Sequence, residues 1–398
     1  MCFVLSLLFT ALVLLLPASV PVDTVGAPVS WYVSPTGSDA NPCTVSMPCL
    51  TLDRAVSLAE PGNMIYARGG MYEVTSAQRI QTIGASGSPV MITAFPGEVP
   101  RFSGARLNLS QYDSLVKIVD SKYVTFDGFE VCCSNGRGIS VSNSQFITIS
   151  HNIVTEIADR AIGGHGDEIT VSYNIVDHVV LNHADLSGSS GWSAAVSSYS
   201  YQDGRPSRNW TFVGNTITRS YGECMIALRI IGFVVRDNLM DGCFSVNLYI
   251  DKGRNGLVTG NTLRASIPGF ERPPWGRSAH GILVGAEESS SVKIAPGNIT
   301  FNRNIIGPGN WNGFVWWADP ANNESWNTYD SLVISNNRII GTTDHAAYFP
   351  AVGPGGSSPC CSRFTSNIIT GEMYFADSYA WTEFGNVRPR LPPRHSRT

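Results

Sequence analysis

Residues 147–154 read ITISHNIV and residues 169–176 read ITVSYNIV, and this repeated phrase decides the fold. A short run rich in β-branched residues is followed by an asparagine and a further apolar pair, and six later copies keep the asparagine. The aligned residues are Asn152, Asn174, Asn215, Asn238, Asn261, Asn304, Asn337 and Asn367. Their spacings of 22, 41, 23, 23, 43, 33 and 30 residues indicate a repeat of 22 or 23 residues with insertions in some copies.

Each copy alternates apolar and polar side chains, as a half-buried strand does. The chain is expected to bend at the asparagine, because this residue tolerates left-handed backbone and can hydrogen-bond its own turn. Stacking the copies places each strand beside its counterpart in the next turn of a coil. The sequence therefore predicts an all-β fold, a parallel β-helix, with a ladder of hydrogen-bonded asparagines inside.

The composition agrees with a large β-rich protein. The chain has 398 residues, of which 43% are apolar and 15% charged, with 39 glycines and 23 prolines. This balance excludes an all-helical fold and a disordered chain. The formal net charge is -4, and only four residues are lysines, which excludes a nucleic-acid partner by charge.

The two ends differ from the repeats. Residues 4–16 form an apolar run that predicts a secretory signal peptide in residues 1–18, with cleavage as late as about residue 27. An uncleaved anchor is the alternative, because Met1-Cys2-Phe3 lacks a positive charge. Residues 51–60 predict a helix that caps the N-terminal end of the coil, and residues 387–398 predict a disordered basic tail. We expect one domain over residues 28–386, secreted and monomeric, with no later membrane span.

Nine cysteines become eight if Cys2 leaves with the signal, and an even number outside the cell suggests disulfide bonds. Cys43 and Cys49 are the expected pair. The other six have partners that the sequence leaves open: Cys132, Cys133, Cys224, Cys243, Cys360 and Cys361. Four sequons would carry glycans in a eukaryotic source: Asn108, Asn209, Asn298 and Asn323. The spacing of the cysteines does not suggest zinc.

Residues 31–73 contain the phrases YVSPTGSD and AEPGNMIYARGGMY, and residues 90–104 read VMITAFPGEVPRFSG. These phrases resemble the opening of secreted right-handed parallel β-helix proteins related to pectate lyases and other polysaccharide lyases. Residues 221–253 resemble the middle rungs of the same family. The resemblance implies a right-handed coil and an extracellular protein that acts on polysaccharide.

The length of the repeats predicts where a site lies. Residues 177–204 and 267–295 must loop out, because the copies that contain them are about one repeat longer than usual. The compact copies between them would form the floor of a groove suited to an extended polymer. Six polar residues are expected on this floor: Glu223, Arg229, Asn247, Tyr249, Asp251 and Lys252.

The resemblance to lyases suggests β-elimination across a uronate glycosidic bond. This chemistry needs the sugar carboxylate to be neutralised and a basic side chain to remove the neighbouring proton. Lys252 is the predicted base, and Arg229 is the predicted carboxylate clamp or alternative base. The predicted substrate-binding residues are Glu223, Asn247, Tyr249, Asp251, His280 and Trp317. Asp251 and Glu223 are candidates for calcium, which the family commonly uses. A structural salt bridge from Asp251 to Arg229 or Arg254 is the alternative.

Two other functions stay open. Gly164-His165-Gly166 resembles a motif of β-helical polygalacturonases, but the paired aspartates of those hydrolases are missing, so His165 is interpreted as a turn residue. A noncatalytic glycan-binding or cell-surface protein could use the same groove. We also expect one of Trp316 and Trp317 to enter the core and the other to be exposed, where it could stack on a sugar ring.

Overall fold

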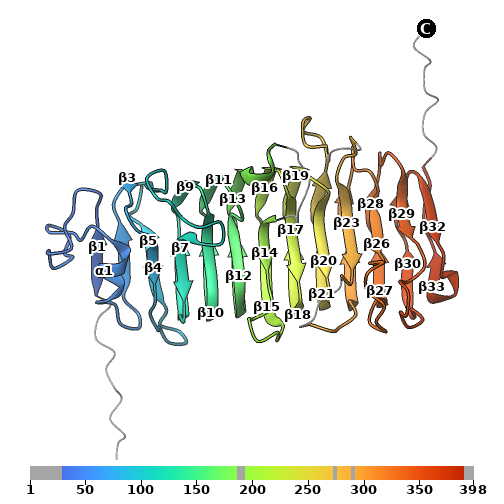
Figure 1. The fold of residues 1–398 in the computed structure, drawn as a ribbon, viewed down its shortest axis with the longest axis horizontal. Coiled ribbons are helices and arrows are strands. Elements are labelled where there is room, and N and C mark those ends of the chain that lie inside the picture. The colour runs from blue at the N-terminus through green and yellow to red at the C-terminus, as the bar shows by residue number, and fades with distance from the viewer. Residues whose placement is uncertain (1–28, 186–192, 272–275, 288–291, 390–398) are drawn as a thin grey trace, which may run out of the picture.

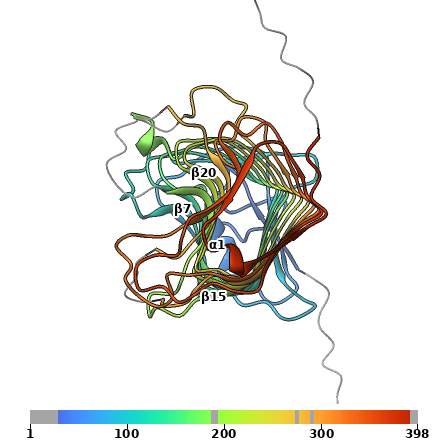
Figure 2. The same cartoon turned by 90° about the vertical axis from the view of Figure 1, so that its right-hand side faces the viewer.

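The computed structural model describes residues 29–185, 193–271, 276–287 and 292–389, which form a long coil of stacked parallel strands (Figure 1). Seen along the coil, the rungs superimpose and enclose a common interior (Figure 2). The predicted signal peptide and the last nine residues of the predicted tail lie outside the described residues. No helix of the described part is long and apolar enough to cross a membrane.

Three columns of strands run along the coil. The first column contains β1 Ser30–Val33, β2 Met64–Ala67, β5 Val90–Ala94, β8 Lys122–Asp127, β10 Arg137–Ser150, β12 Ile162–Ser172, β15 Ser207–Val213, β18 Ile230–Arg236, β21 Arg254–Thr259, β24 Gly297–Asn302, β27 Asp330–Ser335, β30 Ser362–Thr365 and β33 Trp381–Phe384. The second column contains β4 Gln78–Ile80, β7 Ser114–Val119, β14 Ala194–Ser198, β17 Glu223–Leu228, β20 Val246–Asp251, β23 His280–Gly285, β26 Phe314–Trp317, β29 His345–Phe349 and β32 Glu372–Phe375. The long strands β10 and β12 pair in both columns, so these two columns form one 22-stranded sheet in the described part of the chain.

The third column is a separate 11-stranded sheet in the described residues. It contains β3 Gly70–Glu73, β6 Pro100–Ser103, β9 Glu130–Ser134, β11 Ile153–Ile157, β13 Ile175–Val179, β16 Thr216–Ser220, β19 Leu239–Cys243, β22 Thr262–Arg264, β25 Ile305–Ile306, β28 Arg338–Ile339 and β31 Ile368–Ile369. Two 3-10 turns, η1 Leu181–His183 and η2 Ser378–Ala380, complete the regular structure. The predicted parallel β-helix is therefore confirmed.

The predicted asparagine ladder is present at the corner between the first and third columns. Each amide donates from Nδ2 to Oδ1 of the asparagine in the next rung, over 2.9–3.2 Å from Asn152 to a ninth member, Asn386. The bend itself differs from the prediction. The left-handed residue is the one before the asparagine, as at His151 (φ 52°) and Asp237 (φ 57°), so the asparagine is free to point inward.

The capping helix is shorter than predicted. Helix α1 spans Leu52–Val56, and the Thr51 hydroxyl accepts a hydrogen bond from the backbone N–H of Arg54 at its start. The chain then continues in tighter turns, because Ala59 N–H donates to Val56 three residues back rather than four. Leu52, Ala55 and Val56 are buried, so the helix packs its apolar face on the first rungs as expected.

Two disulfide bonds join Cys43 to Cys49, as predicted, and Cys224 to Cys243, which the sequence left open. All four sequon asparagines are exposed on the surface of the coil. Trp316 is buried and Trp317 is 45% exposed, which confirms that one indole enters the core and its neighbour faces outward.

Candidate functional site

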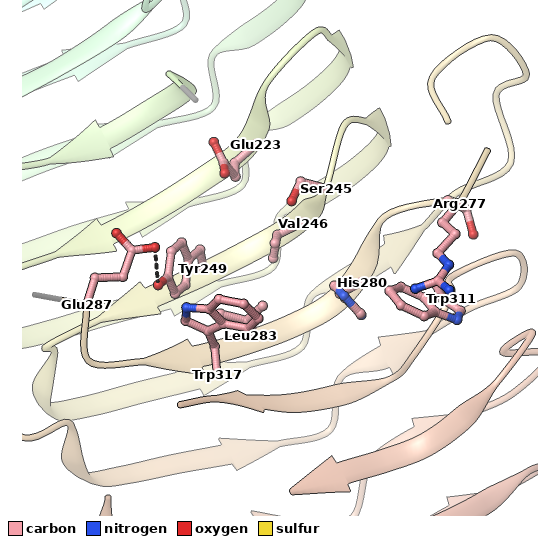
Figure 3. Close-up of a pocket in the computed structure, with 11 residues that line it drawn as sticks. Glu223, Ser245, Val246, Tyr249, Arg277, His280, Leu283, Glu287, Trp311 and Trp317 are labelled. Atoms are coloured by element: carbon pink, nitrogen blue, oxygen red, sulfur yellow. Dashed lines mark hydrogen bonds between the residues drawn. The ribbon is translucent and has the colours of Figure 1, made fainter. Parts of the chain in front are cut away.

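A cavity of about 360 Å³, here called the central cavity, opens on the outer face of the second column over β17, β20, β23 and β26 (Figure 3). It is lined by Glu223, Ser245, Val246, Tyr249, Arg277, Ser278, His280, Leu283, Glu287, Trp311 and Trp317. Its residues come both from the regular strands and from the segments inserted between them. The cavity therefore only partly overlaps the expected floor, because seven of its eleven lining residues follow Asn261 in the chain.

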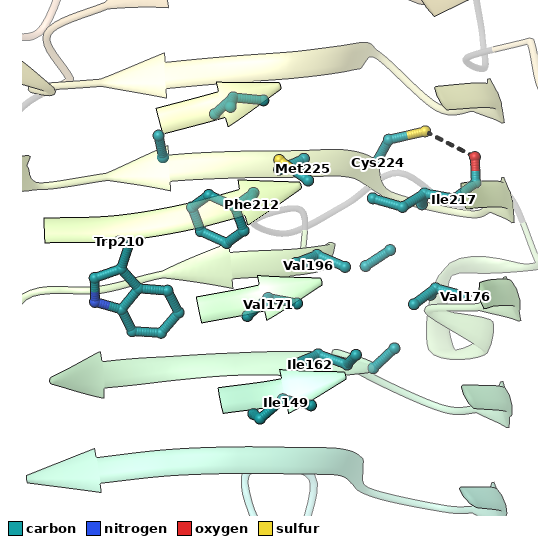
Figure 4. Packing of buried hydrophobic residues seen from close by; sticks show 14 of the residues in the cluster. Ile149, Ile162, Val171, Val176, Val196, Trp210, Phe212, Ile217, Cys224 and Met225 are labelled. Atoms are coloured by element: carbon teal, nitrogen blue, oxygen red, sulfur yellow. Dashed lines mark hydrogen bonds between the residues drawn. The ribbon is translucent and has the colours of Figure 1, made fainter. Parts of the chain in front are cut away.

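Strand register brings the floor residues together. Tyr249 of β20 is paired with Leu283 of β23, and Val246 is paired with His280. Side chains alternate between the two faces of a strand, so residues at corresponding positions of stacked rungs share one face. Beneath the cavity, Met225 of β17 lies in the core and is stacked on Val196 of the preceding strand β14 (Figure 4).

Aromatic rings and two basic groups form one wall of the central cavity. The guanidinium carbon of Arg277 lies 3.9 Å from the ring centroid of Trp311. The imidazole of His280 stacks on the same indole, with centroids 4.8 Å apart and an interplanar angle of 28°. Trp317 adds an exposed indole beside Leu283 in Figure 3. Flat aromatic surfaces next to a planar cation suit the apolar face and polar edge of a sugar ring.

A tyrosine and a glutamate form a hydrogen-bonded pair at the other end of the cavity. The phenol of Tyr249 donates to Oε1 of Glu287 over 2.9 Å. Burial raises the pKa of Tyr249 well above its usual value, and the charges of Asp251 and Glu287 act in the same direction. The phenol therefore keeps its proton at neutral pH.

Asp251 and Lys252 follow Tyr249 closely in the chain but do not line the central cavity. Both are fully buried. Asp251 Oδ1 accepts a 3.0 Å hydrogen bond from the backbone N–H of Glu287, and the Lys252 ammonium lies 4.5 Å from the ring centroid of Trp326. Burial raises the pKa of Asp251 to about 7 and lowers the pKa of Lys252 to about 8. Each group is therefore close to losing its charge at neutral pH.

Arg229 and Asn247 also lie outside the lining of the cavity. Asn247 is fully buried and donates from Nδ2 to the carbonyl of Arg264 over 3.1 Å, so it has a structural role. The charge of Arg229 is a further cause of the lowered pKa of Lys252. The alternative salt bridge between Asp251 and Arg254 is not formed, because Arg254 pairs with Asp330 at 2.9 Å.

Four predicted substrate-binding residues thus meet in the cavity: Glu223, Tyr249, His280 and Trp317. Sequence reasoning missed Arg277, Ser278 and Glu287, which lie in inserted segments outside the repeat. The predicted insertion at 267–295 supplies these residues, whereas no described residue of 177–204 lines the cavity. His165 lies elsewhere, with Nε2 3.1 Å from the Ser142 hydroxyl, and lines none of the described cavities.

A second cavity, of about 660 Å³, adjoins the first. It is lined by Ala265, Glu271, Gly276, Arg277, Ser278, Gly309, Trp311, Thr343 and Asp344. Arg277, Ser278 and Trp311 line both cavities, so the stacked Arg277 and Trp311 side chains form the ridge between them.

Calcium binding by Asp251 and Glu223 stays a prediction. No group of three or more His, Cys, Asp or Glu side chains able to hold a metal ion occurs among them. Of the two candidates, Asp251 already uses Oδ1 to accept the Glu287 N–H, and its raised pKa disfavours the charged form that calcium needs. No step of the chemistry is therefore derived through calcium.

Comparison with known proteins supports the fold. Residues 31–201 match the model of the Pel9A-like right-handed β-helix region. A 140-residue stretch is 38% identical to pectate lyase PEL9 of Emericella nidulans and covers 31% of this chain and 34% of that protein. A 119-residue stretch is 29% identical to the uncharacterized protein YwoF of Bacillus subtilis and covers 30% of this chain and 24% of that protein. The matched stretches thus span about a third of the length of PEL9 and about a quarter of the length of YwoF.

Several solved structures have the same coiled fold, although their sequence identity to this chain is low. A rhamnogalacturonan lyase matches with a TM-score of 0.53 and 12% identity, over 92% of this chain and 90% of that one. A mannuronic-acid-specific family 6 polysaccharide lyase from human gut microbiota matches with a TM-score of 0.54 and 12% identity, over 88% and 84%. The GH136 lacto-N-biosidase of Eubacterium ramulus matches with a TM-score of 0.53 and 13% identity, over 90% of this chain and 67% of that one. These likenesses show the fold alone. The resemblance to right-handed pectate lyase-like β-helices is confirmed, and the central cavity lies beyond the matched residues 31–201.

Proposed function

We propose that this chain, which carries a Pel9A-like right-handed β-helix region, cleaves an acidic, uronate-containing polysaccharide by β-elimination in the central cavity. One observation carries the proposal: a guanidinium and a tyrosine–glutamate pair face the same aromatic-walled cavity. Elimination needs the uronate carboxylate to be neutralised, a proton to leave carbon and the departing oxygen to be protonated. The 38% identity of a 140-residue stretch to pectate lyase PEL9 supports the same reaction class.

Arg277 is the proposed partner of the uronate carboxylate. Among the described residues that line the central cavity, it is the only arginine or lysine. Its planar guanidinium can bind a carboxylate through two parallel hydrogen bonds, and stacking on Trp311 fixes its plane. Neutralising the carboxylate makes the neighbouring C–H more acidic, which lowers the barrier to its removal.

Tyr249 is the proposed acid. Its phenol is protonated at neutral pH, and its single proton must turn from Glu287, which it contacts over 2.9 Å, to the departing oxygen when substrate binds. When the C–O bond breaks, the electron pair of the C–H bond forms the new double bond and the departing oxygen takes the phenol proton. Solvent then returns a proton to Tyr249 from the protonated base.

Lys252 remains the proposed base, with Arg229 as a positioning residue. A pKa of about 8 leaves about a tenth of the amine neutral at pH 7, and the Lys252 Nζ has no hydrogen-bond partner among the described residues. The positive charge of Arg229 favours the neutral amine that a base must present. Because Lys252 is fully buried, the proposal requires that bound substrate displaces the Trp326 ring from its ammonium group.

The test is incubation of purified protein with pectate, alginate, chondroitin and neutral glucans, with added calcium or with a chelator. Elimination makes an unsaturated uronate, so ultraviolet absorbance should rise together with reducing ends on a uronate polymer. Lys252→Ala should abolish the absorbance while ligand binding is kept. The matched control is Lys293→Ala, because Lys293 is exposed and pairs only with Glu324 in the described residues. Absence of both signals on every polymer would contradict catalysis and leave glycan binding.

Hydrolysis is the second candidate, because the structure adds a carboxylate that the sequence did not reveal. Glu223 and Glu287 both line the central cavity, and glycoside hydrolysis uses a pair of carboxyl groups on either side of the bond. Reducing ends that rise without ultraviolet absorbance would favour this reaction. Glu223→Gln and Glu287→Gln should then each abolish the release of reducing ends.

We also propose that the protein is secreted. Its two disulfide bonds are typical of an oxidising compartment, and an extracellular location would bring it to polysaccharide. Expression with residues 1–27 intact, followed by N-terminal sequencing of protein from the medium, tests this. Protein retained in the cell with its first residues uncleaved would contradict it.

A further inference from the structure

Two pairs of adjacent cysteines lie outside the two disulfide bonds. Cys132 and Cys133 belong to β9, and Cys360 and Cys361 precede β30. The sulfur atoms of Cys132 and Cys133 are 2.6 Å apart, compared with about 2.05 Å in a disulfide bond. Cys360 and Cys361 form the second adjacent pair, and both are exposed. Neither pair takes part in the proposed chemistry of the central cavity.

Adjacent side chains of a regular strand cannot meet in this way, because they point to opposite faces of the sheet. In both pairs the backbone departs from the strand conformation at the second cysteine. Cys133 and Cys361 both have left-handed backbone, with φ of 63° in each case. This conformation interrupts the alternation and brings the two sulfur atoms to the same side of the chain.

The coil itself imposes this conformation at Cys133. The residues at the same position of the next rungs are Glu156, His178 and Arg219, with φ of 55°, 54° and 50°. The strand residues on either side stay in register, since Cys132 pairs with Thr155 and Ser134 with Ile157. The left-handed corner is therefore a property of the third column, and it holds the two thiols together before any bond forms.

The same is true at the other pair, at a different corner of the coil. Ser331 and Asn298 occupy the position of Cys361 in the two preceding rungs, with φ of 51° and 50°. Both cysteine pairs thus place their second member at a corner where the scaffold fixes left-handed backbone. Two independent sites with the same arrangement point to one chemistry.

We infer that Cys132 and Cys133 oxidise to each other to form a disulfide bond between adjacent residues, and that Cys360 and Cys361 do the same. Each pair loses two protons and two electrons as one S–S bond forms. The electrons pass to a disulfide-bearing oxidant such as oxidised glutathione, whose own S–S bond is reduced to two thiols. At Cys132 and Cys133 the closure needs no change of partner elsewhere in the chain, because the two sulfur atoms are already 2.6 Å apart.

The order of attack follows from burial. Cys132 is buried, and burial raises the pKa of its thiol to about 12. Cys133 is partly exposed, so an oxidant in solution reaches it first and forms a mixed disulfide there. Cys132, which is 2.6 Å away, then displaces the oxidant and completes the bond.

This bond should behave differently from the other two disulfides. It closes no loop of the chain, so its reduction removes little constraint from the unfolded state. Adjacent Cα atoms are about 3.8 Å apart, below the usual 4.4–6.8 Å of a disulfide, so the small ring is strained and more easily reduced. Cys43, Cys49, Cys224 and Cys243 are buried, which protects their bonds from reductants.

The test uses the full chain equilibrated with oxidised glutathione, then denatured, alkylated without reduction and mapped by mass spectrometry. We expect the peptide with Cys132 and Cys133 to carry no alkyl group and to lack two hydrogen atoms. Low concentrations of dithiothreitol should expose these two thiols to alkylation before Cys43–Cys49 and Cys224–Cys243. Alkylation of both cysteines in the oxidised sample, or linkage of either to another cysteine, would overturn the inference.

A variant supplies the control. Cys133→Ser should leave Cys132 as a thiol that is fully alkylated in the denatured oxidised protein, with both other disulfides intact. Continued protection of Cys132 in that variant would show that it pairs elsewhere. If the variant does not fold, the mass-spectrometric mapping of the unaltered protein still tests the inference, because it needs no substitution.

Discussion

Glu287 is hydrogen-bonded to two residues of one strand: its backbone bonds to Asp251, 36 residues earlier, and its side chain bonds to Tyr249, 38 residues earlier. Its carboxylate accepts the Tyr249 phenol at 2.9 Å, and its N–H donates to Asp251 at 3.0 Å. Tyr249 and Asp251 are both in β20 and differ by two positions. Glu287 therefore links the central cavity to the buried side chain of Asp251. A substitution at Asp251, or at its neighbour Lys252, can therefore alter the cavity through Glu287.

Tyr249→Phe is the sharpest test of the acid. The variant keeps the ring and loses only the phenol oxygen, so we expect the rate of elimination to fall by about 10² to 10⁴-fold, as for removal of a general acid, with little change in ligand affinity. The control is Tyr348→Phe, because Tyr348 continues the same outward row from Val315 and does not line the cavity. An unchanged rate in Tyr249→Phe would remove Tyr249 from the mechanism.

Arg277→Gln tests recognition of the carboxylate. Loss of the guanidinium should weaken binding and turnover of a uronate polymer by about 10-fold or more, the loss expected from a hydrogen bond to a charged group. Arg277→Lys keeps the charge but not the planar pair of donors, so it should restore only part of the loss. Equal losses on neutral glucans and on uronates would show that Arg277 shapes the ridge beside Trp311 and does not recognise charge.

The residues that sequence reasoning found and missed differ in how they depend on the repeat. Glu223, Tyr249, His280 and Trp317 lie on strands, where the period fixes the face and the register of every side chain. Arg277 and Glu287 lie in inserted segments that follow no period, so no sequence signal placed them. The period of the repeat also could not show that Asp251 and Lys252 would be buried.

The buried pair predicts how stability depends on pH. The pKa of Asp251 is raised to about 7, so its contribution to stability is full below about pH 4 and is lost as the pH rises to about 7. The pKa of Lys252 is lowered to about 8, so its contribution is full above about pH 10.5 and is lost as the pH falls to about 8. Each slope is at most about 1.4 kcal/mol per pH unit.

Urea unfolding at a series of pH values measures these slopes. Asp251→Asn should flatten the curve between about pH 4 and 7, and Lys252→Met should flatten it between about pH 8 and 10.5. Differences from the unaltered protein isolate each group from the other titrating residues. Curves that stay parallel to that of the unaltered protein would mean that both groups have ordinary pKa values in the folded chain.

The asparagine ladder predicts that the same Asn→Ala substitution costs more free energy of unfolding inside the ladder than at its end. Asn238 is buried inside the ladder, where Oδ1 accepts from the backbone N–H and the side chain of Asn215, and Nδ2 donates to Asn261 at 2.9 Å. Asn238→Ala leaves these partners buried and unpaired, so we expect the free energy of unfolding to fall by about 2 to 4 kcal/mol.

Asn386 is the matched control, because it makes the same two contacts to Asn367 but is half-buried at the end of the described ladder. Water can replace its amide there, so Asn386→Ala should cost less than about 1 kcal/mol. The position in the coil, and not the residue type, would then set the cost. Equal losses at the two positions, measured by urea unfolding, would mean that exclusion of water from the interior contributes little to the strength of the ladder.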